Sequence, residues 1–165
     1  MEFMGIHEVK ADAKGRVGVP KVFRDKLEGE KITELIVTTN LEGKLPFVEV
    51  VLPDQWQQIM DKLAQEPQFD PMVARFRKIY ILPGQPVSFD TVGRLLVPSY
   101  HRTWAKLERE IIVTGGNNRF SIWDAGLFRQ SVDQTAPHDL DEVKAAIAPR
   151  LRQRRPTPPP PSTQR

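Results

Sequence analysis

The chain contains an internal repeat, and this repeat constrains the possible folds more than any other feature of the sequence. Residues 12–24 read DAKGRVGVPKVFR, and residues 90–102, 78 positions later, read DTVGRLLVPSYHR, with six of the thirteen positions identical. Each copy leads to the same tripeptide, Ile-Val-Thr, at residues 36–38 and 112–114. Similarity at a fixed separation is the signature of a duplicated structural unit. We therefore expect two equivalent modules in one chain.

The start of each copy predicts a tight turn between two strands. In the first copy, Asp12 and Gly15 bracket the turn, because the aspartate can accept backbone N–H groups and the glycine can adopt a positive φ. We predict an incoming strand over residues 6–11 and an outgoing strand over residues 16–19, paired as a hairpin. Arg16 then lies beside the turn. In the second copy Asp90, Gly93 and Arg94 take the same places.

A short helix is expected after each turn. Pro20 and Pro98 stand where a first helical residue stands, and the helix of the first copy should cover residues 20–27. The side chains expected to face inward are Val22, Phe23 and Leu27 in the first copy and Tyr100, Trp104 and Leu107 in the second. Two apolar strands follow in each copy, at 36–39 and 47–52 and again at 111–114 and 120–123. Pro46 indicates that the strand it begins lies at a sheet edge.

The remaining sequence predicts helices and a tail. Amphipathic spacing favours helices over residues 53–63, 72–81, 124–132 and 139–147, and the Pro/Arg-rich sequence from residue 148 onward is typical of disordered or polyproline-like chain. The chain as a whole is therefore expected to be α+β, mainly β, with short helices.

The basic charge of the chain is local rather than general. The sequence pI is about 9.3, but residues 150–165 contain five arginines and no acidic residue, so residues 1–149 carry 19 basic and 21 acidic side chains. The densest basic cluster of this body runs over residues 10–26, with six basic residues against Asp12 and Asp25. A nucleic-acid interpretation must therefore rest on local clusters.

Several classes of function lack the residues they need. Cysteine is absent, which excludes disulfides, thiolate zinc sites and cysteine nucleophiles. His7, His101 and His138 have no metal-ligand spacing and are expected to be surface or partly buried side chains, so we expect no metal and no cofactor. Ser99 and Ser121 lie in no nucleophile motif, and no glycine-rich phosphate loop is present. We do not expect an enzyme. With no signal peptide or apolar segment of membrane-spanning length, we expect a cytoplasmic location.

The two Asp-x-x-Gly-Arg loops are the best candidate for a binding site. A single copy is weak evidence, since its arginine could merely pair with the neighbouring aspartate. Two copies at the same end of paired modules would form a basic surface suited to duplex DNA, with Arg16 and Arg94 as principal contacts. Lys14, Lys10 and Lys21 would support the first loop, whereas Thr91 and Val92 occupy the second. We therefore expect Arg16 to contribute more than Arg94.

Four motifs in order resemble the MraZ family. They are DAKGR followed by PKVFR at residues 12–24, ARFRKIYI at 74–81, DTVGRLLVP at 90–98 and RFSIWD at 119–124, and the resemblance covers roughly residues 1–130. It implies two tandem swapped-hairpin AbrB-like β-barrel modules with short helices. It also implies a ring-shaped homo-oligomer, which could be an octamer.

On this basis we expect five segments: a first module over residues 1–52, a helical connector over 53–82, a second module over 83–124, C-terminal helices over 125–148 and a disordered Pro/Arg-rich tail over 149–165. The resemblance implies a bacterial, nucleoid-associated repressor of the division and cell-wall gene cluster, its own promoter included, that binds repeated promoter boxes in double-stranded DNA. It assigns DNA contact to the loops of Arg16 and Arg94, and turn shaping to Asp12, Gly15, Asp90 and Gly93.

Two alternatives remain. One is an AbrB-like antitoxin or transition-state regulator, although such proteins usually carry one module per chain. The other is an oligomeric scaffold that does not bind DNA and whose Asp-x-x-Gly-Arg loops only close turns.

Overall fold

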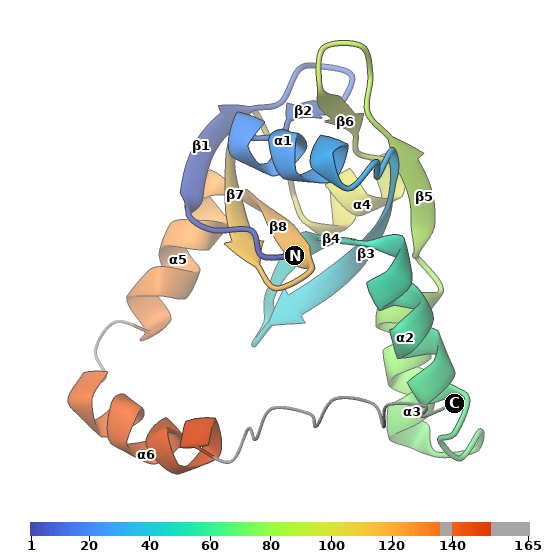
Figure 1. Cartoon of the computed structure of the whole chain (residues 1–165), viewed down its shortest axis with the longest axis vertical. Coiled ribbons are helices and arrows are strands. Elements are labelled where there is room, and N and C mark those ends of the chain that lie inside the picture. Colours follow the sequence, from blue (N-terminus) through green and yellow to red (C-terminus); the bar gives the residue numbers. More distant parts are fainter. Residues whose placement is uncertain (136–139, 153–165) are drawn as a thin grey trace, which may run out of the picture. The chain divides into compact units, whose positions relative to one another are not determined.

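The protein is α+β and mainly β, as the sequence predicts. The computed structural model describes residues 1–135 and 140–152 (Figure 1). Their elements, in chain order, are β1 (Ile6–Lys10), β2 (Arg16–Gly18), α1 (Lys21–Gly29), β3 (Glu34–Glu42), β4 (Leu45–Val51), α2 (Pro53–Leu63), α3 (Pro71–Phe76), the π-helical segment η1 (Arg77–Ile81), β5 (Gln85–Ser88), β6 (Arg94–Leu96), α4 (Ser99–Trp104), β7 (Glu110–Gly116), β8 (Arg119–Asp124), α5 (Ala125–Thr135) and α6 (Leu140–Arg152).

The two repeats exchange strands and build one sheet together. Six strands are ordered β1-β7-β8-β4-β3-β5, so β1 of the first repeat pairs with β7 of the second, and β5 of the second pairs with β3 of the first. The equivalent strands β4 and β8 pair with each other at the centre. The arrangement has pseudo-two-fold symmetry. The sheet has β1 and β5 as its edges and does not close, so the expected β-barrel is wrong in this respect.

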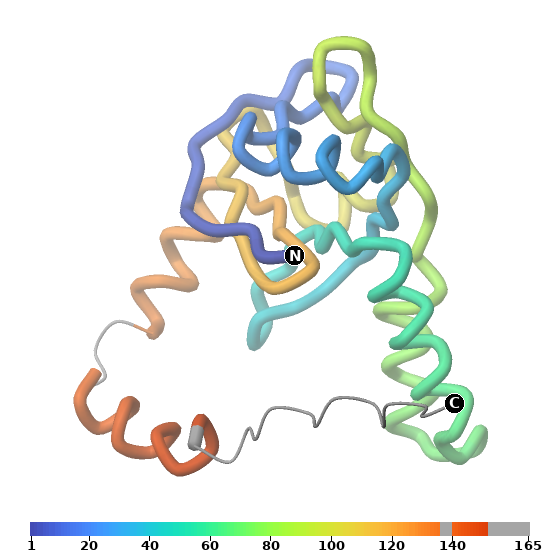
Figure 2. The backbone as a smooth tube through the Cα atoms, in the orientation of Figure 1, coloured from blue at the N-terminus to red at the C-terminus, as the bar shows by residue number. Residues whose placement is uncertain are grey.

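The strands that flank each Asp-x-x-Gly-Arg loop do not form a hairpin ladder. β2 pairs with its repeat equivalent β6 in a separate two-stranded sheet, while β1 joins the large sheet. The arms of the first loop pair only next to the turn, where Ala11 and Val17 form a bridge and the N–H of Asp12 donates to the carbonyl of Arg16. Phe89 and Leu95 form the counterpart bridge of the second loop. The predicted hairpins are therefore wrong beyond the turn, because β2 and β6 pair with each other instead. Figure 2 shows both loops rising at the same end of the molecule.

One apolar core joins the two repeats. Val17 at the centre of β2 and Leu95 at the centre of β6 are fully buried and face each other in the ladder. They share a cluster with residues of β3, β4, β7 and β8 and with Phe23 and Leu27 of α1, and Val9 of β1 and Val87 of β5 pack against it. Burying an aliphatic side chain of this size contributes about 1.5–3 kcal/mol. Because this cluster draws on both repeats, neither repeat has a core of its own.

The short helices differ in part from the predicted burial. Phe23 and Leu27 are buried as expected, but Val22 and Tyr100 are 52% and 58% exposed, so both inward assignments are wrong. In α4 the buried side chain is His101, which takes the repeat position of Phe23 and was expected at the surface or only partly buried. One ring nitrogen of His101 lies 2.9 Å from the carbonyl of Pro83. Both helices begin one residue after the proline.

A helical arm formed by α2, α3 and η1 connects the repeats. The helix predicted over residues 72–81 is present, but its second half widens into the π-helical segment η1. The hydroxyls of Thr38 and Thr39 in β3 donate to the carbonyls of Tyr80 and Ile79, and the phenol of Tyr80 donates to the buried carboxylate of Glu49. These bonds fix the arm to the sheet.

The strand that contains Pro46 is not an edge strand. β4 lies between β3 and β8, but its ladder with β8 covers only Val48–Val51. Pro46 pairs with Leu41 in the part of β4 that extends past β8. A proline is tolerated there because no second neighbour requires its missing N–H group.

The C-terminal helices belong partly to a second compact unit, residues 132–165. The helix predicted over residues 139–147 is present as α6 and continues to Arg152, so the prediction that the tail begins at residue 148 is wrong. The rest of the tail and His138 lie outside the described residues. Among the residues that the structure describes, no helix has the length and apolar character needed to cross a membrane.

Tyr80→Phe should lower the free energy of unfolding by about 1–3 kcal/mol, because Glu49 loses a donor within the fold and a buried acceptor left short of partners is costly. Urea unfolding of the purified chain measures this. Tyr100→Phe is the control, since Tyr100 is exposed, and it should change the value by less than about 0.5 kcal/mol. Equal effects from the two variants would contradict the role given to the Tyr80–Glu49 bond.

Candidate nucleic-acid interface

The two Asp-x-x-Gly-Arg loops have the same internal hydrogen bonds. In the first, one carboxylate oxygen of Asp12 accepts the backbone N–H groups of Lys14 at 3.0 Å and Arg16 at 2.9 Å. In the second, Asp90 accepts those of Val92 at 3.0 Å and Arg94 at 2.9 Å. Each aspartate therefore bonds the backbone of its own turn in the same way.

Gly15 and Gly93 hold the two loops together. Their φ angles are +82° and +78°, in the region that favours glycine. The carbonyl of Gly15 accepts the N–H of Val97, which follows β6, and the carbonyl of Gly93 accepts the N–H of Val19, which follows β2. Each loop is thus bonded to the other repeat. A Cβ on Gly15 would meet the side chain of Arg102 at 2.4 Å, and one on Gly93 would meet that of Arg24.

Both loop arginines are ion-paired and about one-third exposed. The Nε of Arg16 lies 2.5 Å from Asp12, and that of Arg94 lies 2.7 Å from Asp90. One Nη of Arg94 also lies 3.7 Å from Asp12, so Asp12 contacts both arginines. These Asp–Arg ion pairs are therefore the ones expected of a loop that only closes a turn. The pairing engages the Nε edge of Arg16, whose two Nη groups have no partner in the described part of the chain.

The loop aspartates stay charged at unusually low pH. The N–H of Arg16 is the largest cause that lowers the pKa of Asp12, and the N–H of Arg94 does the same for the pKa of Asp90. The nearby guanidinium groups lower both pKa values further. Each aspartate is therefore an anion when the loop meets any partner near neutral pH, and it keeps its arginine in place.

The predicted lysines occupy different surroundings. Lys14 is exposed at the tip of the first loop, in the position that Val92 occupies in the second. Lys10, on β1, lies 3.9 Å from Glu110, and both of these side chains are 65% exposed. Lys21, on α1, is paired at 2.7 Å with Asp25 on the same helix. Lys10 and Lys14 thus remain near the loop, whereas the charge of Lys21 is neutralised locally.

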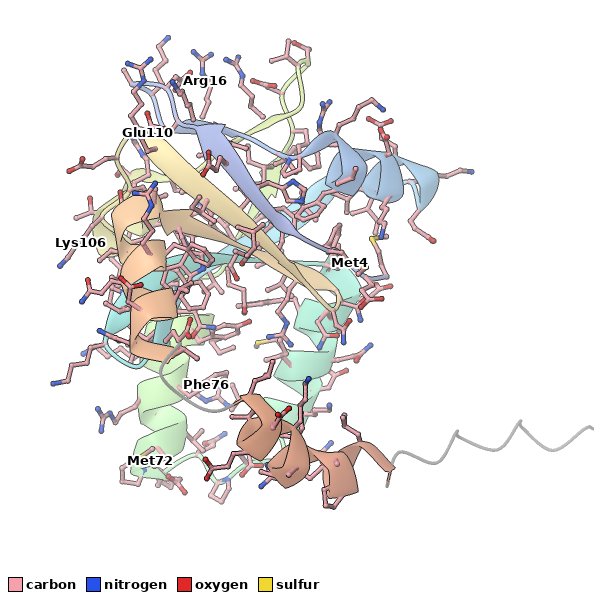
Figure 3. All side chains as sticks on the ribbon, turned by 90° about the vertical axis from the view of Figure 1, so that its left-hand side faces the viewer. Met4, Arg16, Met72, Phe76, Lys106 and Glu110 are labelled. Atoms are coloured by element: carbon pink, nitrogen blue, oxygen red, sulfur yellow. The ribbon has the colours of Figure 1, made fainter. Side chains whose placement is uncertain are left out.

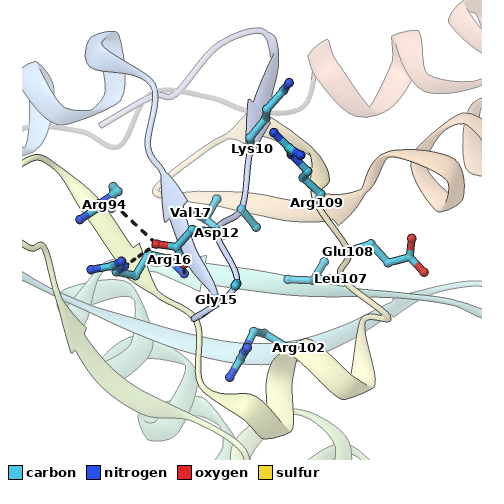
Figure 4. Close-up of a pocket in the computed structure, with 12 residues that line it drawn as sticks. Lys10, Asp12, Gly15, Arg16, Val17, Arg94, Arg102, Leu107, Glu108 and Arg109 are labelled. Atoms are coloured by element: carbon cyan, nitrogen blue, oxygen red, sulfur yellow. Dashed lines mark hydrogen bonds and ion pairs between the residues drawn. The ribbon is translucent and has the colours of Figure 1, made fainter.

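A groove beside the first loop contains two cations that the sequence reasoning missed. It has a volume of about 690 Å³, and its lining includes Lys10, Arg16, Arg94, Arg102 and Arg109. Arg102 comes from α4 and Arg109 from the connection to β7, and Figure 4 shows them around the loop of Asp12 and Arg16. Only Arg102 had a sequence signal, as the last residue of the repeated segment. Within the described residues no group of His, Asp or Glu could hold a metal ion.

The comparison with protein families adds an independent finding. The family model of the MraZ protein, which is described as antitoxin-like, matches residues 2–78 and again residues 81–151. The chain belongs to the MraZ family. Three relatives called transcriptional regulator MraZ are similar to it. That of Hydrogenovibrio crunogenus is 32% identical over 86% of this chain and 89% of its own length. Those of Legionella pneumophila and Halorhodospira halophila are 32% and 33% identical, over 80% and 78% of this chain and 86% and 83% of theirs.

The two MraZ matches contain one loop each, so the family assignment confirms the tandem duplication. Residues 2–78 contain the loop of Arg16 and residues 81–151 contain that of Arg94. Figure 3 shows Arg16 at the loop end of the molecule, far from Met72 and Phe76 of the helical arm. The MraZ repeats therefore present their shared motif at one end of the fold.

Gly15→Ala should destabilise the chain by about 1–3 kcal/mol, because alanine at this positive φ is strained and its Cβ would displace the side chain of Arg102. Gly18→Ala is the matched control. Gly18 lies in β2, and a Cβ added to it would meet nothing within 4 Å, so alanine there should be neutral or slightly stabilising. Thermal unfolding of the two variants measures the difference, and a more damaging Gly18→Ala would contradict the assignment.

Proposed function

We propose that the chain is a DNA-binding transcriptional regulator whose two Asp-x-x-Gly-Arg loops contact duplex DNA. The observation that carries this proposal is the placement of Arg16 and Arg94 on paired strands at one end of the molecule, each about one-third exposed and held by a carboxylate. The naming of three relatives as transcriptional regulators supports it.

The chemistry of the loops suits DNA. Arginine side chains bind phosphate by charge, and the guanidinium fork can donate two hydrogen bonds to guanine in the major groove. The ion pair at Nε restricts the side-chain rotamers of Arg16 before binding, so binding costs less conformational entropy. The Nη groups of Arg16, which have no partner among the described residues, are the donors available for a base or a phosphate.

A finer proposal concerns the genes regulated. From the family resemblance we propose a cytoplasmic, nucleoid-associated repressor of the division and cell-wall gene cluster, its own promoter included, that acts at repeated promoter boxes. We propose that it has no catalytic activity.

The antitoxin-type alternative draws on the family description, but such proteins usually have one module per chain, whereas this chain has two. The scaffold alternative draws on the Asp–Arg pairs, which by themselves only close the turns.

Arg16→Ala should weaken binding to the chain's own upstream DNA more than Arg94→Ala does, because Lys14 and Lys10 surround the first loop whereas Val92 stands at the tip of the second. Removing a base contact should cost about 1–3 kcal/mol and should affect the specific site more than random DNA. Removing a phosphate contact should weaken both equally and reduce the salt slope by about 0.9. Anisotropy titrations over a salt series measure these quantities.

Each variant should first be shown to keep the oligomer mass and unfolding midpoint of the wild type. Arg75→Ala serves as a charge control, because Arg75 lies on the helical arm away from both loops. If a folded Arg16→Ala variant binds the upstream DNA with wild-type affinity, the first loop is not a DNA contact. The scaffold alternative would then be favoured.

We also propose a homo-oligomer, ring-shaped by family resemblance. A swapped hairpin could take its partner strands from a second chain, but here the strand exchange is completed within a single chain and does not by itself require a second copy. Support comes from the edges of the sheet, β1 and β5, which offer open backbone groups to a neighbouring chain, and from Ile6, which is 65% exposed on β1. Light scattering at micromolar protein should give a mass of several chains. A monomer at every concentration would contradict the proposal.

A further inference from the structure

The groove beside the first loop is built from both repeats. The first repeat supplies Lys10, Asp12 and Arg16, and the second supplies Arg102 from α4 and Arg109 from the connection before β7. The backbone joins these parts, because the N–H of Ala11 donates to the carbonyl of Arg109 at 2.9 Å. The groove therefore depends on the contact between the two repeats.

Positive charge exceeds negative charge along this groove. Five cationic side chains line it against two acidic ones, Asp12 and Glu108. Asp12 is already engaged by Arg16 and Arg94, and in Figure 4 the carboxylate of Glu108 is turned away from the loop arginines. No described acidic residue forms an ion pair with Arg102 or Arg109. Lys10, Arg16 and Arg94 are each paired with a carboxylate, so the cations available to an anion are Arg102 and Arg109.

The guanidinium of Arg102 lacks an acceptor. Its side chain packs against Gly15, and its Nε is buried without a hydrogen-bond partner in the described part of the chain. Buried charged donors are normally paired. Arg24, its repeat equivalent, instead donates through Nε to the carbonyl of Val19 at 3.2 Å. The arginine at this repeat position thus has an internal acceptor beside the second loop and none among the described residues beside the first.

Among the described residues, the cavity beside the second loop is smaller and less basic. It has a volume of about 120 Å³, and its lining contains one cation, Arg24, against Glu28 and Asp90. Ser88 takes the repeat position of Lys10. The two loops therefore share their turn geometry but differ in the electrostatics of their flanks.

We propose that this groove is a binding site for the DNA sugar-phosphate backbone, with Arg102 and Arg109 as phosphate ligands that fix the register in which the first loop meets the bases. This inference rests on the proposed function and adds two residues outside the Asp-x-x-Gly-Arg motif. The ligand chemistry is a phosphodiester, and the recognition is independent of base sequence. Such contacts position a protein on the duplex, while base contacts specify the site.

The test is a salt series of anisotropy titrations with the full chain, using its own upstream DNA and a random duplex of equal length. Arg109→Ala and Arg102→Ala should each reduce the salt slope by about 0.9 for each phosphate no longer neutralised. Each should weaken binding to both duplexes by the same factor. The ratio of specific to random affinity should stay within about twofold of the wild type, since phosphate contacts carry no base information. Arg109 is exposed, so its variant tests the proposal even if Arg102→Ala perturbs the loop.

Two matched controls separate the groove from general charge. Lys106→Gln removes a cation from the same connection but outside the groove lining, and Arg24→Ala removes the repeat equivalent of Arg102. Both should keep the wild-type slope. If Arg109→Ala keeps the wild-type salt slope, or if Lys106→Gln reduces the salt slope equally, the proposal that the groove binds phosphate is overturned. If Arg16→Ala still abolishes specific binding in that case, the proposed function stands, whereas a wild type that binds neither duplex overturns both.

Discussion

The reciprocal pairing of the two repeats is the constraint on which the rest of this structure depends. β2 and β6 are three residues each, too short to be stable alone, and they persist because they pair with each other over a shared core. The same exchange places β1 against β7 and β5 against β3. Since the core residues come from both repeats, we expect the two to fold as one cooperative unit.

This pairing also determines where the arginines stand. Arg94 faces Gly18 in the antiparallel β2–β6 ladder, and Arg16 faces Leu96, so the two arginines lie at opposite ends of the ladder. Both are on the face opposite the buried Val17 and Leu95. The glycine carbonyls bond each loop to the opposite repeat, which fixes the separation between the loops. Like charges held at a surface repel each other, and the carboxylates of Asp12 and Asp90 offset that repulsion. The loops are therefore ordered before any partner arrives.

Duplication within one chain allows the two loops to diverge. Two copies related by exact symmetry would have identical flanks. Here Val92 takes the repeat position of Lys14, and Ser88 takes that of Lys10. The turn geometry is unchanged, because it depends only on Asp, Gly and Arg and on backbone bonds. The electrostatics differ, because they depend on side chains at variable positions. Under the proposed function, a surface of this kind would meet DNA with a stronger and a weaker side.

The sequence by itself determined the local structure and the site's central residues. Asp12, Gly15 and Arg16 could be assigned to a turn because their chemistry acts over four or five residues, and the repeat predicted a second turn of the same form. Apolar spacing located Phe23 and Leu27 in the core. Tertiary structure alone decided which strands pair. Two equivalent repeats offer equivalent pairing surfaces, so the pattern of apolar residues is the same whether each repeat forms its own hairpin or the repeats exchange strands. For the same reason the exposure of Val22, the burial of His101 and the meeting of Arg102 and Arg109 at the first loop depended on contacts between residues far apart in the chain.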